Sequence, residues 1–206
     1  MNPIEKLTEY FLKFPGIGPR QARRFVYFLL SSGSAFRKTL ATQILALDEA
    51  VSQCASCRRF FLRGRNASLL CDICSSVNTD QTTLLIVEKE TDFDAIKKTS
   101  AYAGRYFILG GSLPILEPNP NEKISIKELV EEIKKQAESG ALKEIILAMG
   151  ATREGENTAQ YVAKTLEPVV KKYSLRISSL GRGLSTGTEL EYSDADTFAS
   201  ALSNRK

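Results

Sequence analysis

The sequence predicts an α/β protein whose core is a mostly parallel sheet with helices on both faces, preceded by a helical region and a cysteine-rich segment. Three observations predict this. Apolar side chains recur at helical spacing before residue 53, four cysteines follow in two pairs, and short apolar runs alternate with amphipathic stretches after residue 80. With 206 residues, of which 43% are hydrophobic and 25% charged, the chain is long enough for one or two compact units.

Residues 1–53 are predicted to form three helices. In the first of them, Ile4, Leu7 and Phe11 recur every three to four residues and form one apolar stripe. The PGIGP sequence cannot continue a helix and therefore separates the first helix from the second. The predicted helices cover residues 3–13, 20–30 and 34–51.

Residues 80–176 are predicted to alternate strands with helices, which is typical of a parallel sheet covered by helices. The predicted strands cover residues 83–87, 106–109, 144–149 and 175–180. The predicted helices between them cover residues 92–98, 124–138 and 157–172. Residues 177–206 are predicted to form a tail that is first rich in glycine, serine and threonine and then forms a short helix near 194–203.

The PGIGP sequence joins the first two predicted helices through a tight hairpin. Gly16 and Gly18 let the backbone turn sharply and approach another chain closely, and Pro19 suits the first turn of a helix. The free N–H groups at the start of that helix, together with its dipole, favour a bound phosphate. The pattern resembles the helix-hairpin-helix element of many DNA-binding proteins, so residues 1–53 are a predicted DNA-binding region.

Three arginines follow the hairpin directly. Arg20 and Arg24 share a helical face, and Arg23 lies beside them. We expect them, with Gly16 and Gly18, to hold DNA phosphates with little sequence preference. An ordinary turn with a solvated basic face is the alternative. Packing of this element against a copy of itself is compatible with DNA binding.

Charge is unevenly distributed along the chain. Residues 1–79 contain 11 Lys and Arg against 5 Asp and Glu, whereas residues 80–206 contain 17 against 19. A basic front and a mildly acidic back favour a polyanion at one end and a protein partner at the other, while a random asymmetry would give the same numbers. The chain has no histidine, which excludes histidine-based acid–base catalysis and histidine metal sites.

Four cysteines form two C-x-x-C pairs, Cys54 with Cys57 and Cys71 with Cys74, separated by thirteen residues. This spacing is typical of a structural zinc site with four thiolate ligands, so residues 54–76 are a predicted zinc finger. A redox pair or two disulfides are the alternatives. A redox C-x-x-C usually opens a helix in a βαβ unit, whereas both pairs here are expected in a loop between domains. Four protein ligands leave zinc no open position for catalysis.

Acidic residues follow predicted strands in the second half of the chain. Glu88 ends the first strand, and TREGE follows the strand at 144–149. This arrangement resembles the Toprim domain of topoisomerases, primases and related nucleases, in which a Glu and an Asp-x-Asp hold magnesium for phosphoryl transfer. The two aspartate positions contain Gly150 and Thr152, and neither side chain is a carboxylate ligand.

Glu88, Glu154 and Glu156 remain as carboxylates near this predicted site. We expect them to form an acidic surface for a basic partner protein. A weakly held magnesium ion, or plain solvated glutamates at a helix start, are the alternatives.

The order of these parts resembles the RecR family of bacterial recombination mediators along essentially the whole chain. The most specific matches are PGIGPRQARR, the cysteine spacing, EGENTAQYV and GTELEY. The resemblance implies a cytoplasmic, nucleoid-associated protein without catalytic activity that forms a tetrameric ring and clamps DNA. It implies RecO and RecF as partners at single-stranded gaps, where the family helps to load the recombinase. It also implies that Arg20 and Arg24 face DNA and that the cysteines bind one zinc ion per chain.

A magnesium-dependent nuclease or topoisomerase-like enzyme is the alternative function, with Glu88, Glu154 and Glu156 as its ion ligands. A covalent mechanism would also need a placed tyrosine, and none of the seven tyrosines lies in a recognised motif. GRGLSTGT lacks the G-K-[ST] ending of a nucleotide-binding P-loop. The sequence has no long apolar run and no signal segment, which predicts a soluble protein.

Overall fold

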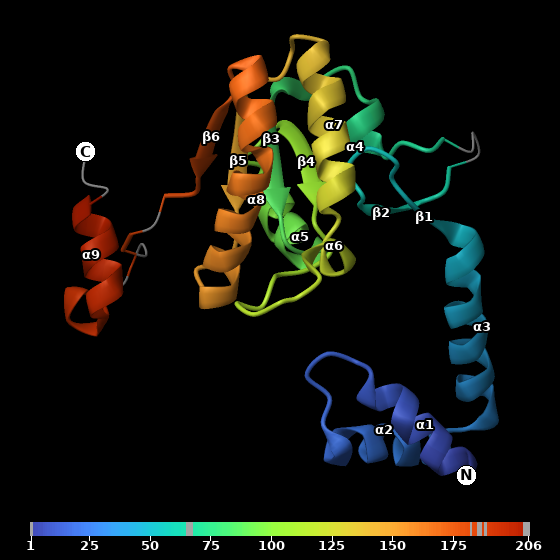
Figure 1. Ribbon diagram of the computed structural model, residues 1–206. Helices are drawn as coiled ribbons and strands as arrows, with labels where there is room; N and C mark the ends of the chain where they lie inside the picture. Colours follow the sequence, from blue (N-terminus) through green and yellow to red (C-terminus); the bar gives the residue numbers. More distant parts are fainter. Residues whose placement is uncertain (1, 65–67, 182, 185–186, 188, 204–206) are drawn as a thin grey trace. The chain divides into compact units, whose positions relative to one another are not determined.

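Figure 1 shows the computed structural model, which describes residues 2–64, 68–181, 183–184, 187 and 189–203. The chain divides into two compact units, Met1–Ser52 and Gln53–Lys206. The predicted tail at 177–206 falls only partly within the described residues, because these exclude 182, 185–186, 188 and 204–206. No helix in the described part of the chain is long and apolar enough to span a membrane.

The first unit is helical and consists, in its described part, of α1 (Pro3–Leu12), α2 (Pro19–Ser31) and α3 (Ser34–Ala50). The side chain of Asn2 accepts a hydrogen bond from the Glu5 N–H at 2.9 Å, and the Glu5 carboxylate accepts one from the Asn2 N–H at 3.0 Å, so that α1 begins with a capping box. Ala22 and Val26 of α2 are fully buried. No residue of α1 or α3 in the described chain is buried.

The second unit is built on a sheet of strands β3 (Asp80–Val87), β4 (Gly104–Ile108), β5 (Glu144–Ala148) and β6 (Arg176–Ser179). The strand order is β4-β3-β5-β6, and each neighbouring pair is parallel, as the sequence predicts. In the central strand β3, Leu85 lies opposite both Tyr106 and Ile146. The β4 and β6 strands are the two edges of the sheet.

The sheet is covered on both faces by helices α5 (Glu90–Thr99), α7 (Ile126–Glu138) and α8 (Arg153–Tyr173), which confirms the predicted α/β class. Successive side chains of a strand point to opposite faces. Leu84 and Ile86 of β3 therefore pack with α7 and α8, whereas Leu85 and Val87 pack on the other side with α5. Figure 1 shows α7 and α8 in front of the strands.

The cysteine segment covers part of the same sheet face as α5. Cys54, Cys57 and Cys71 belong to one buried cluster with Leu85 and Val87. The sequence places this segment in a loop between domains, whereas the structure places it inside the second unit, because three of its cysteines are buried against the sheet. Its regular elements are β1 (Val51–Gln53) and β2 (Phe60–Leu62), which form a separate two-stranded sheet, and α4 (Asp72–Ser75).

Helix α8 begins earlier than the sequence predicts. Its first residue is Arg153, whereas apolar periodicity gives a start at Asn157. The hydroxyl of Thr152 accepts a hydrogen bond from the Gly155 N–H at 3.0 Å and so caps the helix start. The first turn of α8 therefore includes the acidic residues of TREGE.

Two short elements complete the second unit. The loop between β4 and α7 contains α6 (Pro120–Lys123), whose first residue is a proline. After the sheet, a single 3₁₀ turn η1 (Leu190–Tyr192) precedes α9 (Ala195–Ser203), where the sequence predicts a short helix near 194–203.

Candidate metal centre and nucleic-acid interface

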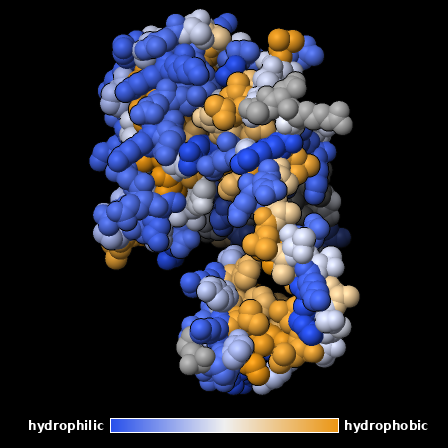
Figure 2. Space-filling model, turned by 90° about the vertical axis from the view of Figure 1, so that its right-hand side faces the viewer, coloured by the Kyte–Doolittle hydropathy of each residue, from blue (hydrophilic) through white to orange (hydrophobic). Residues whose placement is uncertain are grey.

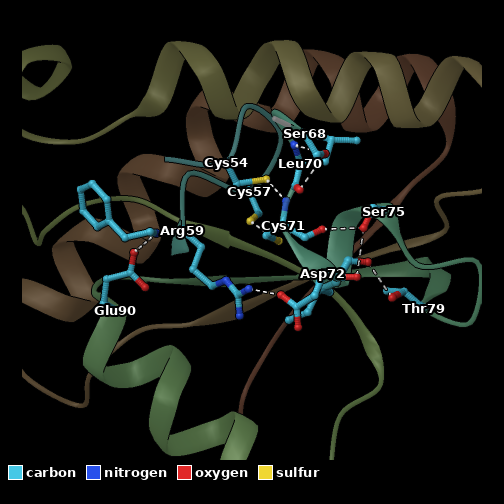
Figure 3. Close-up of polar contacts among 12 residues, drawn as sticks. Cys54, Cys57, Arg59, Ser68, Leu70, Cys71, Asp72, Ser75, Thr79 and Glu90 are labelled. Carbon is cyan, nitrogen blue, oxygen red and sulfur yellow. Dashed lines mark hydrogen bonds and ion pairs between the residues drawn. The ribbon is translucent and has the colours of Figure 1, made fainter. Parts of the chain in front are cut away.

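The four cysteines of the chain converge on one point in the second unit. Their Sγ atoms all lie within 4.8 Å of one another, and those of Cys57 and Cys71 are 3.6 Å apart. Cys54, Cys57 and Cys71 are buried, Cys74 is half-buried, and all four are free thiols. Figure 3 shows Cys54, Cys57 and Cys71 turned toward one another.

Local backbone turns aim each pair of sulfur atoms inward. In the first pair, the Arg58 N–H donates to the Cys54 carbonyl at 3.0 Å and the Cys54 N–H donates to the Arg59 carbonyl at 2.8 Å, with Arg58 in the left-handed region at φ 66°. In the second pair, Cys71 is the N-cap of α4, and the Ser75 N–H donates to its carbonyl at 3.0 Å. The Cys71 N–H also donates to Sγ of Cys54 at 3.4 Å, which links the two pairs.

The four sulfur atoms fit a single tetrahedral metal ion. With Zn–S bonds of about 2.3 Å, tetrahedral geometry separates the sulfur atoms by about 3.8 Å. The 3.6 Å between Cys57 and Cys71 is close to this value. Among the residues that the structure describes, these cysteines are the one group of three or more side chains close enough to hold a metal ion.

Hydrogen bonds among the thiols make their acidities unequal. The hydrogen bond from Cys57 holds the pKa of Cys54 well below its usual range, and the same contact raises the pKa of Cys57. The thiolate is the form that binds a metal, so metal binding by these cysteines would release protons.

Contacts of Arg59 and Phe60 stabilise the cysteine segment and attach it to α5. Arg59 forms an ion pair with Asp72, visible in Figure 3, and its guanidinium lies 4.9 Å from the centre of the Phe93 ring. The Phe60 N–H donates to Oε1 of Glu90 at 2.7 Å. Sequence reasoning missed Asp72 and Glu90, because only their positions beside a cysteine and at a helix start distinguish them from other acidic residues.

Further contacts join the segment to the sheet edge and to α7. The Ile108 N–H of edge strand β4 donates to the Cys57 carbonyl at 2.9 Å. The Ser56 hydroxyl donates to Oε1 of Glu132 on α7 at 2.6 Å. The cysteine cluster is thus attached to three elements of the second unit, α5, β4 and α7.

The predicted hairpin lies in the first unit, between α1 and α2. Gly16 has φ 75°, in the left-handed region that glycine adopts most readily. Gly18 is the N-cap of α2, Pro19 is its first residue, and no side chain caps this helix start in the described chain. An anion could therefore bind the N–H groups of the first turn.

The three predicted DNA-contacting arginines are exposed on the first two turns of α2. Arg23 lines a hollow that it shares with Glu5 and Glu9 of α1. Those carboxylates would repel a phosphate placed beside Arg23. We therefore expect Arg20 and Arg24 to contact phosphate more closely than Arg23.

An apolar groove, which sequence reasoning missed, lies in the same unit. Phe14, Phe25, Phe28 and Phe36 line it, and each is between 39% and 58% exposed. The groove encloses about 440 Å³. Figure 2 shows the large apolar patch on this unit. The signal in the sequence is that 11–36 contains more phenylalanine than one buried helical stripe requires.

Glu88 and Gly150 meet at the carboxyl edge of the main sheet, after β3 and β5. Glu88 is 7% exposed, and its Oε1 is buried without a hydrogen-bond partner in the described structure. Burial, followed by repulsion from Asp92, raises the pKa of Glu88. A Cβ atom at Gly150 would lie 3.5 Å from Oε2 of Glu88. A carboxylate at this position would share an ion with Glu88, and glycine supplies none.

Glu154 and Glu156 are exposed in the first turn of α8. The helix dipole stabilises carboxylates at this place. In the described residues they do not join Glu88 in a group of three ligands close enough to hold a metal ion. The start of α8 is packed tightly, since a Cβ at Gly155 would meet the Gly150 carbonyl oxygen at 2.1 Å.

Comparison with known proteins gives a match to a domain family and matches to full-length relatives. Residues 82–180 match the Toprim domain family, a range that contains β4, β5, β6 and nearly all of β3. The whole chain is similar to proteins named recombination protein RecR. Identity is 34% to the one from Chloroherpeton thalassium, over 99% of this chain and 96% of the relative. It is 35% to the one from Chloroflexus aurantiacus strain J-10-fl, over 99% and 94%.

A third relative, the recombination protein RecR of a Cyanothece species, is 32% identical over 100% of this chain and 96% of its own length. These relatives cover both units described above, including the hairpin and the cysteine segment. The resemblance predicted from PGIGPRQARR and the cysteine spacing is confirmed. The chain therefore belongs to the RecR family of recombination proteins.

Proposed function

We propose that this recombination protein is a non-catalytic DNA clamp and mediator. In this proposal it forms a ring, a tetramer by family resemblance, and works with RecO and RecF at single-stranded gaps to help load the recombinase. One observation supports it most. Exposed arginines follow a helix start that no described side chain caps, and the carboxyl edge of the main sheet, called the Toprim edge below, has Gly150 and Thr152 in place of two carboxylates. The chain would grip phosphates and break no bond in them.

The geometry of the hairpin supports the DNA-binding part of the proposal. Gly16 makes the turn, and the open start of α2 offers N–H groups beside Arg20 and Arg24. These groups recognise the backbone, which is the same for every sequence. Each subunit offers only a few phosphate contacts, so a ring that links several such sites raises the overall affinity.

The Toprim edge supports the absence of catalysis. Gly150 and Thr152 are found where a magnesium-dependent enzyme needs carboxylates, and the Thr152 hydroxyl is used to cap α8. Glu88 alone would hold a hard divalent cation weakly. The remaining acidic residues, Glu154 and Glu156, suit a surface for a basic partner protein, for which RecO and RecF are the candidates.

The apolar groove of the first unit supports self-association. Phe28 is 58% exposed in the groove and Phe14 is 55% exposed. Covering such side chains stabilises by about 25 cal/mol for each Å² removed from water. A second copy of this chain is the occupant we propose for this groove, since a ring requires contacts between copies.

The metal in this proposal is Zn²⁺ with a structural role. Thiolate ligands favour zinc among the common divalent cations, and four of them fill the tetrahedral positions. The cysteines would then hold the segment between β1 and β3 against the sheet, and the metal would take no part in chemistry on DNA.

Charge reversal at the hairpin tests DNA binding. We expect the affinity for labelled single- and double-stranded oligonucleotides, measured by fluorescence anisotropy, to fall steeply as salt rises. Arg20→Glu/Arg24→Glu should weaken binding at least about 100-fold at low salt, because two phosphate contacts become repulsive. Arg23→Gln should weaken it less than Arg24→Gln.

The matched control is Lys127→Glu/Lys134→Glu on α7, which changes the net charge equally at two exposed residues of the second unit. It should leave DNA affinity within about twofold, since an effect of overall charge alone is small at moderate salt. Equal losses in both double variants, or no loss in either, would remove the hairpin from the proposed DNA interface.

One observation favours a second candidate function, a magnesium-dependent nuclease or topoisomerase-like enzyme. Oε1 of Glu88 is buried without a hydrogen-bond partner in the described structure, which an ion would supply. Incubation of supercoiled and nicked DNA with the protein and magnesium tests it. If the protein cuts or relaxes DNA and this activity disappears in Glu88→Gln, the enzyme function is right and the proposal of a non-catalytic clamp is wrong.

A further inference from the structure

An exposed apolar turn lies in the loop between β4 and α6. Ile115 and Leu116 are its central residues, and the Glu117 N–H donates to the Pro114 carbonyl at 3.2 Å to close it. Ile115 is 62% exposed and Leu116 is 90% exposed. Glycine, proline and small polar residues usually fill the tips of such turns. Two adjacent aliphatic side chains at the tip therefore make this turn a candidate contact surface of the second unit.

The turn is held in place by α8. Nδ2 of Asn157 donates to the carbonyls of Leu113 and Pro114, both at 3.1 Å. The Thr158 hydroxyl accepts a hydrogen bond from the Leu113 N–H at 2.8 Å. Leu113 itself is buried in the core that α7 and α8 form with the sheet. A turn anchored in this way loses little conformational freedom when it binds a partner.

Carboxylates accompany the turn. Glu117 is its fourth residue, and Glu154 and Glu156 lie on the first turn of α8 beside Asn157. Arg153 is the one basic residue on that turn of α8. Figure 1 shows the loop after β4 reaching the N-terminal end of α8. This excess of negative charge repels a DNA backbone and an anionic membrane, and it attracts a protein surface with lysine or arginine.

We propose that Ile115 and Leu116 form the apolar anchor of a protein-docking surface, and that the partner presents an apolar socket bordered by basic residues. The inference rests on the proposed function, because it deepens the acidic partner surface at Glu154 and Glu156. Binding energy in protein interfaces concentrates in a small desolvated apolar centre with a polar rim around it. The turn supplies the centre, and the carboxylates speed the encounter and orient the partner.

The test measures binding of the full chain to purified RecO and, separately, to purified RecF by biolayer interferometry. Ile115→Ser/Leu116→Ser changes only exposed side chains and should leave the fold intact. We expect it to weaken binding to one of these two proteins at least about tenfold. Val77→Ser is the matched control, because Val77 is 91% exposed in another turn, before β3 instead of after β4. It should bind as the unchanged chain does.

Asn157→Ala tests the preorganisation of the turn. It keeps both apolar side chains and removes the two hydrogen bonds that hold their loop. We expect an intermediate loss of affinity, about two- to fivefold, which the loss of preorganisation explains. Full affinity in Asn157→Ala would contradict the role given to α8.

The outcomes separate this inference from the proposed function. If the unchanged chain binds RecO or RecF and the double serine variant binds equally well, the anchor is wrong and the partnership stands. If the unchanged chain binds neither protein, both the proposed partnership and the inference about Ile115 and Leu116 are wrong. A changed mass of the double variant by light scattering would assign the turn to a contact between copies, and a changed DNA affinity would assign it to DNA. Either result overturns the inference.

Discussion

The two units of the molecule differ in how much of their apolar surface they bury. In the second unit, Phe107, Leu84 and Ile133 are fully buried between the sheet and its helices. In the described part of the first unit, only Ala22 and Val26 are buried, and large aromatic side chains remain in the open groove. One chain thus joins a unit with its own core to a unit that by itself buries little of its apolar surface.

This difference separates two sources of stability. Burying a methylene group stabilises by about 0.8 kcal/mol, so the two small residues buried in the first unit contribute little. The second unit combines two apolar clusters with four cysteines that could hold a metal ion against one face of the sheet. We therefore expect the second unit to be stable by itself and the first to depend on contacts with other molecules. Four predictions test this comparison.

Loss of the metal should have the largest effect, and it should concern the second unit. Binding of a structural zinc ion contributes about 10 kcal/mol or more to local folding. Cys71→Ser should abolish metal binding, measured by inductively coupled plasma mass spectrometry, and lower the melting temperature followed by circular dichroism by roughly 10 °C or more. Ser75→Ala is the control, because this hydroxyl bonds to the Cys71 carbonyl and not to sulfur. A metal-free Cys71→Ser protein with unchanged melting would contradict a structural role.

A core truncation should come next. Phe107→Ala removes a fully buried ring and should destabilise the second unit by about 3–5 kcal/mol. Denaturation with guanidinium at two protein concentrations should give the same loss at both, since this core needs no partner. Val26→Ala in the first unit should cost less, and its effect should depend on protein concentration. Concentration dependence in Phe107→Ala instead would mean that the two units do not differ in this way.

A change in the groove should alter self-association. Phe28→Ser places a hydroxyl where we propose that a second copy packs, and it should weaken association at least about tenfold. Light scattering across a dilution series measures the mass. Tyr10→Ser is the control, because Tyr10 is 64% exposed on α1 and does not line the groove. An unchanged mass of Phe28→Ser at every concentration would leave the groove without the proposed occupant.

The smallest effect concerns Glu88. Burial raises the pKa of Glu88 above the ordinary value of 4.5. At a pH between 4.5 and this raised pKa, the folded state therefore binds more protons than the unfolded state. Stability should therefore fall as the pH rises through the raised pKa, and the penalty should be absent below pH 4.5. Glu88→Gln should be more stable than the unchanged chain at about pH 8, with the gain disappearing at about pH 4. Thermal melts at both values check it, and parallel pH profiles would show that Glu88 is not the cause.

Much of the fold could be predicted from local patterns. The apolar run at 83–87 is found in β3 (Asp80–Val87), because a short β-rich run between turn residues has few other stable arrangements. The apolar period predicts helix α8, but the helix begins at Arg153 and not at the predicted Asn157. The Thr152 hydroxyl caps the helix and so decides where it starts. The spacing of apolar residues does not show which residue caps a helix.

The candidate sites could likewise be predicted only in part from the sequence. Convergence of the cysteines could be predicted from their spacing, since two C-x-x-C turns bring four sulfur atoms together. Burial of the cysteine segment against the sheet could not, because it depends on Cys57 meeting β4, a contact between residues far apart in the sequence. The apolar groove could not be predicted either, since the exposure of Phe25 depends on how the neighbouring helices pack.

The hydrogen bond from the Ile108 amide to the Cys57 carbonyl has a consequence for solubility. An uncovered edge strand is a template for aggregation, because its free N–H and C=O groups pair readily with a strand of another molecule. Here the cysteine segment occupies part of that edge. Stripping the metal would open a place for intermolecular β pairing, so the apoprotein should precipitate as fibrous β-structure at temperatures where its main sheet is still folded.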